Sequence, residues 1–454
     1  MTRAGSNQRV VIVGADPGGM AAVSQIRKHD PAAQIVAFEK GHWTSYSACG
    51  IPYFIGGDTR QQTLSELITM TPDQHRARGL DLRMGHEVVE IDVAAGIVKA
   101  LENATGTLSE EPFDQLLLGT GGRAIRPNIP GIDLPHVLVA HTLDDAQALH
   151  SIADARMGDD SWNVVVIGAG YIGLEMAEAF VTRGHRPVLV DLQDYPLPGL
   201  VPELGVLVKG CVEHSGVEFI GGTEVTAITP ESVVCGDREL PADLVVISVG
   251  TAPCSELAAA AGIELGAGRA IAVDERMQTS AEGVFAAGDC ATSRHLITGK
   301  QVFFPLGTNA NKHARVAGIN IGGGQARMPG VLGTAVTRYL ELEIATTGLS
   351  LDQAQAAGID ACSEQISTLT KPGYMPDSST AQVVLVAERG SGRVLGGQIV
   401  GGSGSAKRID TIATAATASM SVAQLLDTDL AYAPPFSTVW DMVAVAAREL
   451  LKKV

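Results

Sequence analysis

The sequence NVVVIGAGYIGLEMAEAFVTRGHRPVLVD occupies residues 163–191 and has the pattern of a strand, a glycine turn, a helix and a second strand. Every glycine of the G-x-G-x-x-G fingerprint is present: Gly168 makes the tight turn, Gly170 admits a pyrophosphate and Gly173 lets the helix pack. Asp191 ends the second strand, where a carboxylate accepts from a ribose 2′-hydroxyl and repels a 2′-phosphate, and no arginine immediately follows it. The stretch predicts a Rossmann-like unit that favours NADH, with NADPH as the alternative.

A second unit of this kind begins at RVVIVG, residues 9–14, and ends at QIVAFE, residues 34–39. Its turn departs from the fingerprint, because Asp16 stands where the second glycine is expected. The acidic strand end nevertheless follows the first turn after about 20 to 25 positions, which is typical of a dinucleotide-binding unit. The glycines of this turn are Gly14, Gly18 and Gly19.

Two carboxylates give the first unit the acceptors that a flavin dinucleotide needs. Glu39 stands at the strand end, where it can accept from an adenosine ribose. GVFAAGDCA, residues 283–291, has the pattern of a strand that delivers Asp289 to a turn near the ribityl chain and pyrophosphate. The sequence therefore predicts an FAD site beside the NADH site. The other expected cofactor-binding residues are Lys40, Thr120, Gly121, Gly250 and Gly288.

The order of these patterns indicates three domains and an α/β fold. FDQLLLGTGGRAIRPNIPG, residues 113–131, is typical of a crossover between domains, so we place a boundary near residue 115. After residue 325 the chain changes to β-rich stretches followed by helices, without another glycine fingerprint. We expect an FAD-binding domain at 1–114 and 250–325, an NAD(P)H-binding domain at 115–249, and a C-terminal α+β domain at 326–454.

Composition excludes several classes of function. The 454 residues carry a net charge of -17, which disfavours nucleic acid and anionic membranes as partners. No signal peptide and no apolar run of about 18 residues is apparent, so we expect a cytoplasmic protein. The six cysteines include no C-x-x-C pair, so neither a disulfide framework nor a metal site is indicated.

Cys49 stands apart from the other cysteines. It lies in TSYSACGIPYFIGG, residues 44–57, a few positions after Glu39, so the chain carries it from the adenosine end of the flavin toward its reactive ring. A thiol is a useful nucleophile as the thiolate, which a helix N-terminus or a nearby cation favours. Cys290, beside Asp289, is the main rival, and we interpret it as a packing residue.

Several motifs together resemble the flavoprotein disulfide reductases, and within them the single-cysteine branch of coenzyme A disulfide reductase, NADH oxidase and NADH peroxidase. The motifs are the Ser45-x-x-x-Cys49-Gly50-x-Pro52-Tyr53 segment, the Gly168–Gly173 turn, the Gly250-x-x-Pro253 hinge, Ala287-Gly288-Asp289, and AYAPPFS at residues 431–437. The likeness extends over essentially the whole chain and is greatest to coenzyme A disulfide reductase. It implies an FAD domain interrupted by an NAD(P) domain, and a C-terminal dimerisation domain that makes a homodimer whose sites the partner chain completes.

The resemblance also implies how the site works. Two-cysteine members use C-x-x-x-x-C and a His-Glu pair near the C-terminus, whereas this chain has only Cys49 there and no histidine beyond His313. Oxidases and peroxidases of the branch have a histidine in the first glycine turn, where this chain has Pro17. Tyr374 and Tyr432 match two tyrosines of coenzyme A disulfide reductases, and a phenol is a suitable acid for a departing thiolate.

Substrate anchoring follows the family less closely. Gln25, Arg27 and Ser45 match positions that face coenzyme A in relatives. Ala48 replaces the asparagine before the cysteine, and Gln74 stands where a lysine is expected. These departures weaken the expected phosphate clamp. The candidate substitute cations are Lys28, Lys312 and Arg315.

The predicted function is an FAD-dependent NAD(P)H oxidoreductase that reduces a low-molecular-weight disulfide, above all coenzyme A disulfide, through Cys49. The alternatives are a persulfide or polysulfide reductase, an NADH oxidase that cycles Cys49 through a sulfenate, and a slow flavin redox sensor. Pro17 argues against the oxidase.

Overall fold

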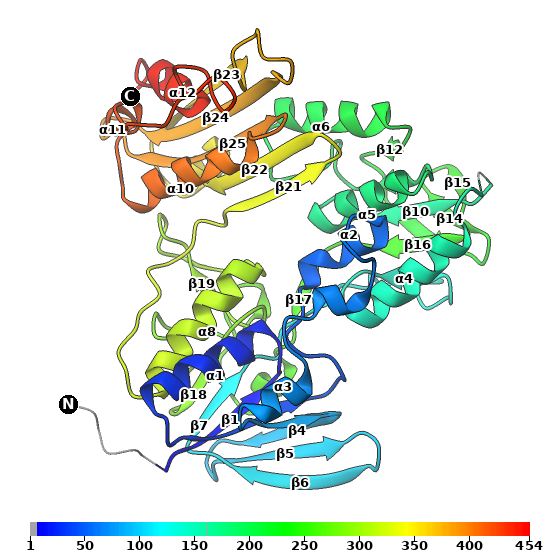
Figure 1. The fold of residues 1–454 in the computed structure, drawn as a ribbon, viewed down its shortest axis with the longest axis vertical. Coiled ribbons are helices and arrows are strands. Elements are labelled where there is room, and N and C mark those ends of the chain that lie inside the picture. Colours follow the sequence, from blue (N-terminus) through cyan, green and yellow to red (C-terminus); the bar gives the residue numbers. More distant parts are fainter. Residues whose placement is uncertain (1–6, 160) are drawn as a thin grey trace.

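The structure is a computed structural model that describes residues 7–159 and 161–454. Its three units are arranged around β1 (Arg9–Val13), around β10 (Val164–Ile167) and around β22 (Leu342–Gly348), and the C-terminus lies in the third (Figure 1). The main sheet of each unit has five strands and is parallel in the first and second units and antiparallel in the third, which confirms the predicted fold class. Within the described ranges, no helix has the length and apolar character that a membrane crossing requires.

The first unit is built on a five-stranded parallel sheet in the order β18-β7-β1-β2-β3. Successive β1 side chains face opposite sides, so Ile12 packs under α1 and α8, whereas Val11 packs under the antiparallel meander β4-β5-β6. The bounds are α1 (Pro17–His29), β2 (Gln34–Glu39), α3 (Pro72–Ala77), β3 (Asp81–Met84), β4 (His86–Asp92), β5 (Ile97–Glu102), β6 (Thr107–Pro112), β7 (Gln115–Leu118), α7 (Glu256–Ala260), β18 (Val284–Ala286), β19 (Ser293–Arg294), β20 (Gln301–Val302) and α8 (Gly307–Ile321).

The second unit repeats this plan on a parallel sheet in the order β12-β11-β10-β16-β9. Val166 of β10 packs with the helices, and Val165 packs with the small antiparallel sheet β13-β14-β15. The bounds are β9 (Val137–Val139), α4 (Leu143–Ala155), α5 (Tyr171–Thr182), β11 (Val188–Val190), α6 (Pro202–His214), β12 (Glu218–Ile220), β13 (Val225–Ile228), β14 (Ser232–Cys235), β15 (Arg238–Pro241) and β16 (Leu244–Ile247).

The third unit is an antiparallel sheet in the order β21-β22-β25-β24-β23 with helices on one face. Leu385 of β24 packs against α10, α11 and α12, whereas its neighbour Val386 faces the core shared with the second unit. The sheet is therefore covered on both faces. The bounds are β21 (Ala335–Tyr339), α9 (Leu351–Ala356), β23 (Ala361–Leu369), β24 (Thr380–Glu388), β25 (Val394–Gly401), α10 (Ile409–Thr417), α11 (Val422–Leu426) and α12 (Met442–Leu450).

One expected boundary is wrong. The boundary near residue 115 would place β7 in the second unit, yet β7 pairs in parallel with β1 and β18 in the first sheet. The crossing comes later, where β8 (Gly122–Ala124) pairs with β17 (Thr251–Pro253). The apolar run of β7 completes the buried centre of the first sheet, and this long-range pairing places it in the first unit.

The segment that carries Cys49 leaves the first unit. Residues Ala48–Gly50 form a short 3-10 helix that continues into α2 (Ile51–Gly56). Figure 1 shows α2 beside α4 and α5, and Phe54 and Ile55 belong to the core of the second unit. The cysteine is therefore positioned at the junction between the two Rossmann-like units.

Candidate active site

The first glycine turn lies at the edge where three parallel strands end. Residue 13 of β1 pairs with residue 118 of β7, and residue 118 pairs with residue 286 of β18, so the turns that follow these strands meet. Gly14 has a φ of 100°, and a Cβ there would overlap the carbonyl of Gly119. A Cβ on Gly18 would lie 2.9 Å from the Ala287 carbonyl oxygen. Only glycine fits this close approach, which brings Asp289 to the turn as the sequence predicts.

The two predicted ribose acids occupy equivalent positions. Glu39 accepts from the backbone N–H of Ala15, just after the first glycine, at 2.9 Å and from that of Gly41 at 2.8 Å. Asp191 accepts from the N–H of Ala169, also just after the first glycine, at 2.6 Å and from that of Gln193 at 2.8 Å. Both carboxylates are thus held against their glycine turns, where a ribose would meet them.

The second glycine turn combines close packing with open space. A Cβ on Gly168 would lie 2.5 Å from the Ser248 carbonyl oxygen, and one on Gly173 would overlap the Gly168 carbonyl. A Cβ on Gly170 would meet nothing within 4 Å. Gly170 therefore begins α5 with space for a phosphate group, and the helix N-terminus favours negative charge there. The residues fit a dinucleotide.

Asp16, where the turn departs from the fingerprint, belongs to a group of carboxylates with Glu39 and Asp289. Asp16 accepts from the Tyr46 N–H at 3.0 Å and so connects the turn to the segment leading to Cys49. Burial, with Glu39 and Asp289 nearby, raises the pKa of Asp16 to about 7. The pKa of Asp289 is also raised by burial, against the opposing effect of His141. Hydroxyl groups of a ribityl chain are suitable donors for such a cluster.

The remaining predicted cofactor residues lie near the crossing between the units. The Thr120 hydroxyl donates to the Cys254 carbonyl at 2.5 Å, next to the β8–β17 pair. Gly121 and Gly250 have φ values of 69° and 118°, which glycine adopts without strain. The Lys40 carbonyl accepts from the Asn103 side chain at 2.9 Å. The cofactor-binding roles of these residues stay predictions.

Cys49 is exposed, unlike every other cysteine in the described ranges. Cys290 is 0% exposed, and its Sγ lies 3.3 Å from the Leu118 carbonyl oxygen, as a packing residue would be. A bound ligand can therefore reach the sulfur of Cys49 but not that of Cys290. This difference in access agrees with the interpretation from sequence.

The electrostatic surroundings of Cys49 differ from expectation. The sequence led us to expect a cation or a helix terminus that favours the thiolate, but the structure raises the pKa of this thiol. Burial by surrounding atoms is the main cause, and the charges of Glu175 and Asp289 add to it. Because Glu175 comes from α5 of the second unit, local sequence around the cysteine gave no sign of it.

Glu175 belongs to a polar group behind the cysteine-bearing helix. Its carboxylate accepts from the Thr337 hydroxyl at 2.8 Å and lies 3.4 Å from the Tyr53 hydroxyl. Burial raises the pKa of Glu175 and, together with Glu175 itself, that of Tyr53. No motif in the sequence pointed to these residues, although Glu175 stands two positions after the last glycine of the fingerprint.

A second overlooked group surrounds the predicted substrate-binding residues. Ser45 Oγ lies 2.8 Å from His75 Nε2, and Arg27 donates to the Arg78 carbonyl at 2.6 Å. Burial is the main cause that lowers the pKa values of His75 and Arg27, and the nearby charges of Arg78 and Arg27 lower that of His75 further. Gln74, where the family has a lysine, instead forms a capping box that starts α3. The cations near Ser45 are thus Arg27 and Arg78, whose charges act on His75, and not a lysine at position 74.

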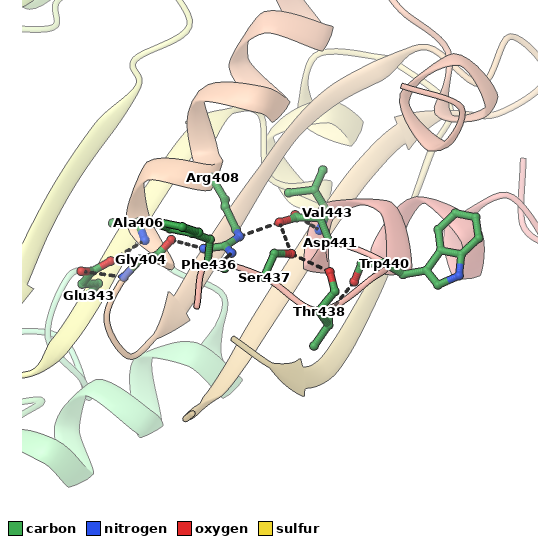
Figure 2. Close-up of polar contacts among 10 residues, drawn as sticks. All are labelled: Glu343, Gly404, Ala406, Arg408, Phe436, Ser437, Thr438, Trp440, Asp441 and Val443. Atoms are coloured by element: carbon green, nitrogen blue, oxygen red, sulfur yellow. Dashed lines mark hydrogen bonds and ion pairs between the residues drawn. The ribbon is translucent and has the colours of Figure 1, made fainter. Parts of the chain in front are cut away.

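The two predicted tyrosines lie on exposed segments of the third unit. Tyr374, between β23 and β24, is 72% exposed, and Tyr432 is 46% exposed. Figure 2 shows how the segment after Tyr432 is anchored: Arg408 contacts Asp441 at 2.7 Å and donates to the Phe436 carbonyl at 2.5 Å. No hydrogen bond within the described ranges connects either tyrosine with Cys49 of the same chain. Their catalytic roles stay predictions that require a second chain.

Comparison with known proteins agrees with this arrangement. The model of the pyridine nucleotide-disulphide oxidoreductase family matches residues 8–317, and the model of the corresponding dimerisation domain matches residues 334–443. An NAD(P)H sulfur oxidoreductase (CoA-dependent) of Pyrococcus furiosus is 38% identical over 98% of this chain and 99% of its own. An NAD(P)H coenzyme A polysulfide/persulfide reductase of Pyrococcus horikoshii is 37% identical over 98% of each chain.

A solved NAD-dependent persulfide reductase of A. fulgidus is similar in structure as well, with a TM-score of 0.93 and 35% identity over 98% of this chain and 83% of its own. Proteins named NADH oxidase and coenzyme A disulfide reductase also match over nearly the full length, at 32% and 25% identity. The chain therefore belongs to the pyridine nucleotide-disulphide oxidoreductase family and is an NAD(P)H-dependent flavoprotein oxidoreductase.

Proposed function

We propose that this enzyme reduces the sulfur–sulfur bond of a small coenzyme A derivative, with Cys49 as the redox-active thiol and coenzyme A disulfide as the first substrate to test. The exposure of Cys49 at the junction of the two nucleotide units carries this proposal. A thiol placed there is accessible to a substrate and lies beside the unit whose glycine turn would hold the flavin.

The cofactors divide the chemistry between the two glycine turns. FAD held at the first turn would supply the two electrons, and NADH held at the second turn would be their source. Gly14, Gly18 and Glu39 would hold the flavin, and Gly170 and Asp191 would hold the nicotinamide cofactor, because these residues provide the close approach and the ribose acceptors. The role of the chain itself is to position a thiol and its substrate.

Cys49 performs the exchange steps. Its thiolate attacks one sulfur of the disulfide, a mixed disulfide forms, and the first coenzyme A leaves as a thiolate that takes up a proton. Two electrons then cleave the mixed disulfide, which restores the Cys49 thiolate and releases the second coenzyme A thiol. Tyr432 of the partner subunit would protonate the departing thiolate, with Tyr374 as a further phenol at the same interface. This role requires a homodimer, which the dimerisation-domain match supports.

Coenzyme A is favoured by the cations beside the cysteine segment. Ser45 lies four positions before Cys49 and contacts His75, while Arg27 and Arg78 lie around the same histidine. Guanidinium groups are well suited to phosphate. We propose that this group binds the phosphates of coenzyme A in place of the missing lysine at Gln74, with Gln25 as a neighbouring contact on α1.

The second candidate function is reduction of a persulfide or polysulfide bound to coenzyme A. The names of the relatives from Pyrococcus and A. fulgidus favour it, and the same thiolate attack applies to a persulfide. An oxidase is disfavoured, because Pro17 begins α1 where a histidine would supply a proton to oxygen. A slow redox sensor would turn over no faster than free flavin.

An anaerobic experiment tests the proposal. The holoenzyme is mixed with NADH and one equivalent of coenzyme A disulfide, or with coenzyme A persulfide, and released thiol or sulfide is measured. Cys49→Ser is expected to abolish release while keeping flavin. Cys211→Ser, in α6, is the control and should keep the wild-type rate. Unchanged turnover in Cys49→Ser would remove the thiol mechanism, and a faster rate with the persulfide would select the second candidate.

A further inference from the structure

A small polar cavity lies behind the cysteine-bearing helix, between α2 and α5 near β21. Its volume is about 10 Å³, roughly what a single water molecule needs. It is not part of either glycine turn. The lining residues are Pro52, Tyr53, Gly56, Asp58, Glu175, Glu178, Ala179 and Thr182.

Glu178 has one oxygen that the protein leaves unpaired. The residue is only 5% exposed, and its Oε1 lies 3.3 Å from Arg338 Nε. Its Oε2 is buried and has no hydrogen-bond partner within residues 7–159 and 161–454. A buried polar atom without a partner is costly, so this oxygen is satisfied by a proton that it carries or by a water molecule in the cavity.

Glu178 has polar neighbours on both sides. Glu175 lies three positions earlier on α5, so the two side chains share one helix face, and the charge of Glu175 acts on the Cys49 thiol. On the other side, Arg338 donates to Asp58 at 2.6 Å, and both of these side chains reach solvent. Asp58, Glu175 and Glu178 line the same cavity, so polar side chains lie between the neighbourhood of the thiol and the surface.

The proposed reaction needs such a group. NADH, one proton and a disulfide yield NAD⁺ and two thiols, so each turnover takes one proton from solvent. Burial by surrounding atoms is the main cause of the raised pKa of the Cys49 thiol, although the residue itself is exposed and open to a ligand. Once a substrate covers the exposed side of Cys49, a proton reaches the leaving thiolate through the protein or across the dimer interface.

We propose that Glu178 and Glu175 form a proton relay that delivers a solvent proton from the Asp58 side, through a water molecule in the cavity, to the Cys49 site. The inference rests on the proposed thiol chemistry and deepens it. Tyr432 of the partner subunit protonates the first coenzyme A thiolate. Glu178 gives its proton to Glu175, Glu175 gives one to the second coenzyme A thiolate when the mixed disulfide is cleaved, and Glu178 is reprotonated from solvent, so no other reactant is needed.

Protonation equilibria agree with this role. Burial raises the pKa of Glu178 to about 7, and Arg338 opposes the effect only in part. Glu178 can therefore both hold and release a proton near neutral pH. The titratable or charged groups that face it are Asp58 and Tyr53 from the α2 segment, Glu175 from its own helix, Arg338 and Tyr339 from β21, and Cys211 from α6.

Infrared spectroscopy of the wild-type holoenzyme tests the first requirement without a mutation. With isotope-labelled glutamate, a carboxylic-acid carbonyl band should be present at about pH 6 and disappear by about pH 8, following the Glu178 pKa. Glu178→Gln should lack this band, and Glu213→Gln, at an exposed position of α6, should keep it. Absence of a titrating band in the wild type would overturn the relay.

Kinetics test the second requirement. In Glu178→Gln, thiol release from the disulfide should fall by about 10-fold or more, while the reduction of bound flavin by NADH in a single turnover stays at the wild-type rate. Glu178→Asp should recover part of the loss, because it keeps a carboxyl group. Wild-type thiol release in Glu178→Gln, or an equal loss in the flavin step, would contradict the relay. Failure of the proposed function would instead appear as full turnover in Cys49→Ser.

Discussion

Replacing Asp191 with asparagine tests whether the second glycine turn selects NADH. The carboxylate is held against the turn by the N–H groups of Ala169 and Gln193, at 2.6 and 2.8 Å, so its remaining lone pairs would be available to a ribose hydroxyl. A hydrogen bond to a charged acceptor is worth about 1.5 to 3 kcal/mol. Its loss should weaken NADH binding by about 10- to 150-fold, whereas NADPH, no longer repelled, should lose less or gain.

The assay is a titration of the oxidised holoenzyme with NAD⁺ and NADP⁺, followed by flavin fluorescence, together with KM for both reduced cofactors. Asp194→Asn is the matched control, because Asp194 is an exposed carboxylate in the same loop. It should leave the ratio of the two affinities unchanged. Equal losses for NADH and NADPH, or the same change in both variants, would refute the assignment of Asp191 to the ribose.

Further predictions address the rest of the site. Gly173→Ala should abolish NADH binding but keep the flavin, because a Cβ at this position overlaps the backbone of the turn. Flavin absorbance and an NAD⁺ titration measure the two effects, and tight NAD⁺ binding would contradict the prediction. Because the pKa of Asp16 is raised to about 7, its stabilising contribution is present at about pH 4 and lost as pH rises through about 7. The melting temperature should therefore fall less with rising pH in Asp16→Asn than in the wild type. An equal fall of the melting temperature in both proteins would contradict this. In Glu175→Gln the thiol pKa of Cys49 should fall, so alkylation at neutral pH should be faster than in the wild type; slower alkylation would show that Glu175 does not act on the thiol. Tyr432→Phe should lower kcat for disulfide reduction with little change in the NADH-dependent flavin step, and stopped-flow traces that change equally in both steps would count against its role as the acid.

The fold and both nucleotide turns could be predicted because their signals are local. The backbone geometry of one βαβ unit requires two features: glycines at fixed spacing after the first strand, and an acidic residue at the end of the second. The structure places Glu39 and Asp191 at matching positions, each accepting from the N–H after the first glycine. The approach of Asp289 to the first turn was also predictable, because parallel strands bring their carboxyl ends to one edge.

The boundary near residue 115 failed for the opposite reason. The run Gln115–Leu118 is an apolar strand before a glycine turn, and either sheet could have taken it on local grounds. Pairing with β1 and β18, which lie more than 100 residues away on either side, decides its place. Pairing partners of short buried strands are a property of the whole sheet and are not encoded in the strand itself.

The surroundings of Cys49 were the least predictable part of the site. Glu175 follows it by 126 positions and reaches it only because α2 packs on α5. His75 and Arg78 likewise join Ser45 and Arg27 through the packing of α3, not through a motif. The sequence therefore singled out the exposed cysteine, but the groups that set its pKa depend on contacts between distant segments.

The most direct test of the central claim is to find which sulfur receives the electrons. The holoenzyme is used as isolated with its natural thiol adduct, or after incubation with coenzyme A disulfide. It is reduced anaerobically with one equivalent of NADH and then alkylated. Peptide mass spectrometry measures the extent of alkylation at each cysteine. We expect Cys49 alone to become newly alkylated, with one coenzyme A thiol released for each cysteine modified. New alkylation at any other cysteine, or unchanged alkylation at Cys49 with fully reduced flavin, would contradict the account.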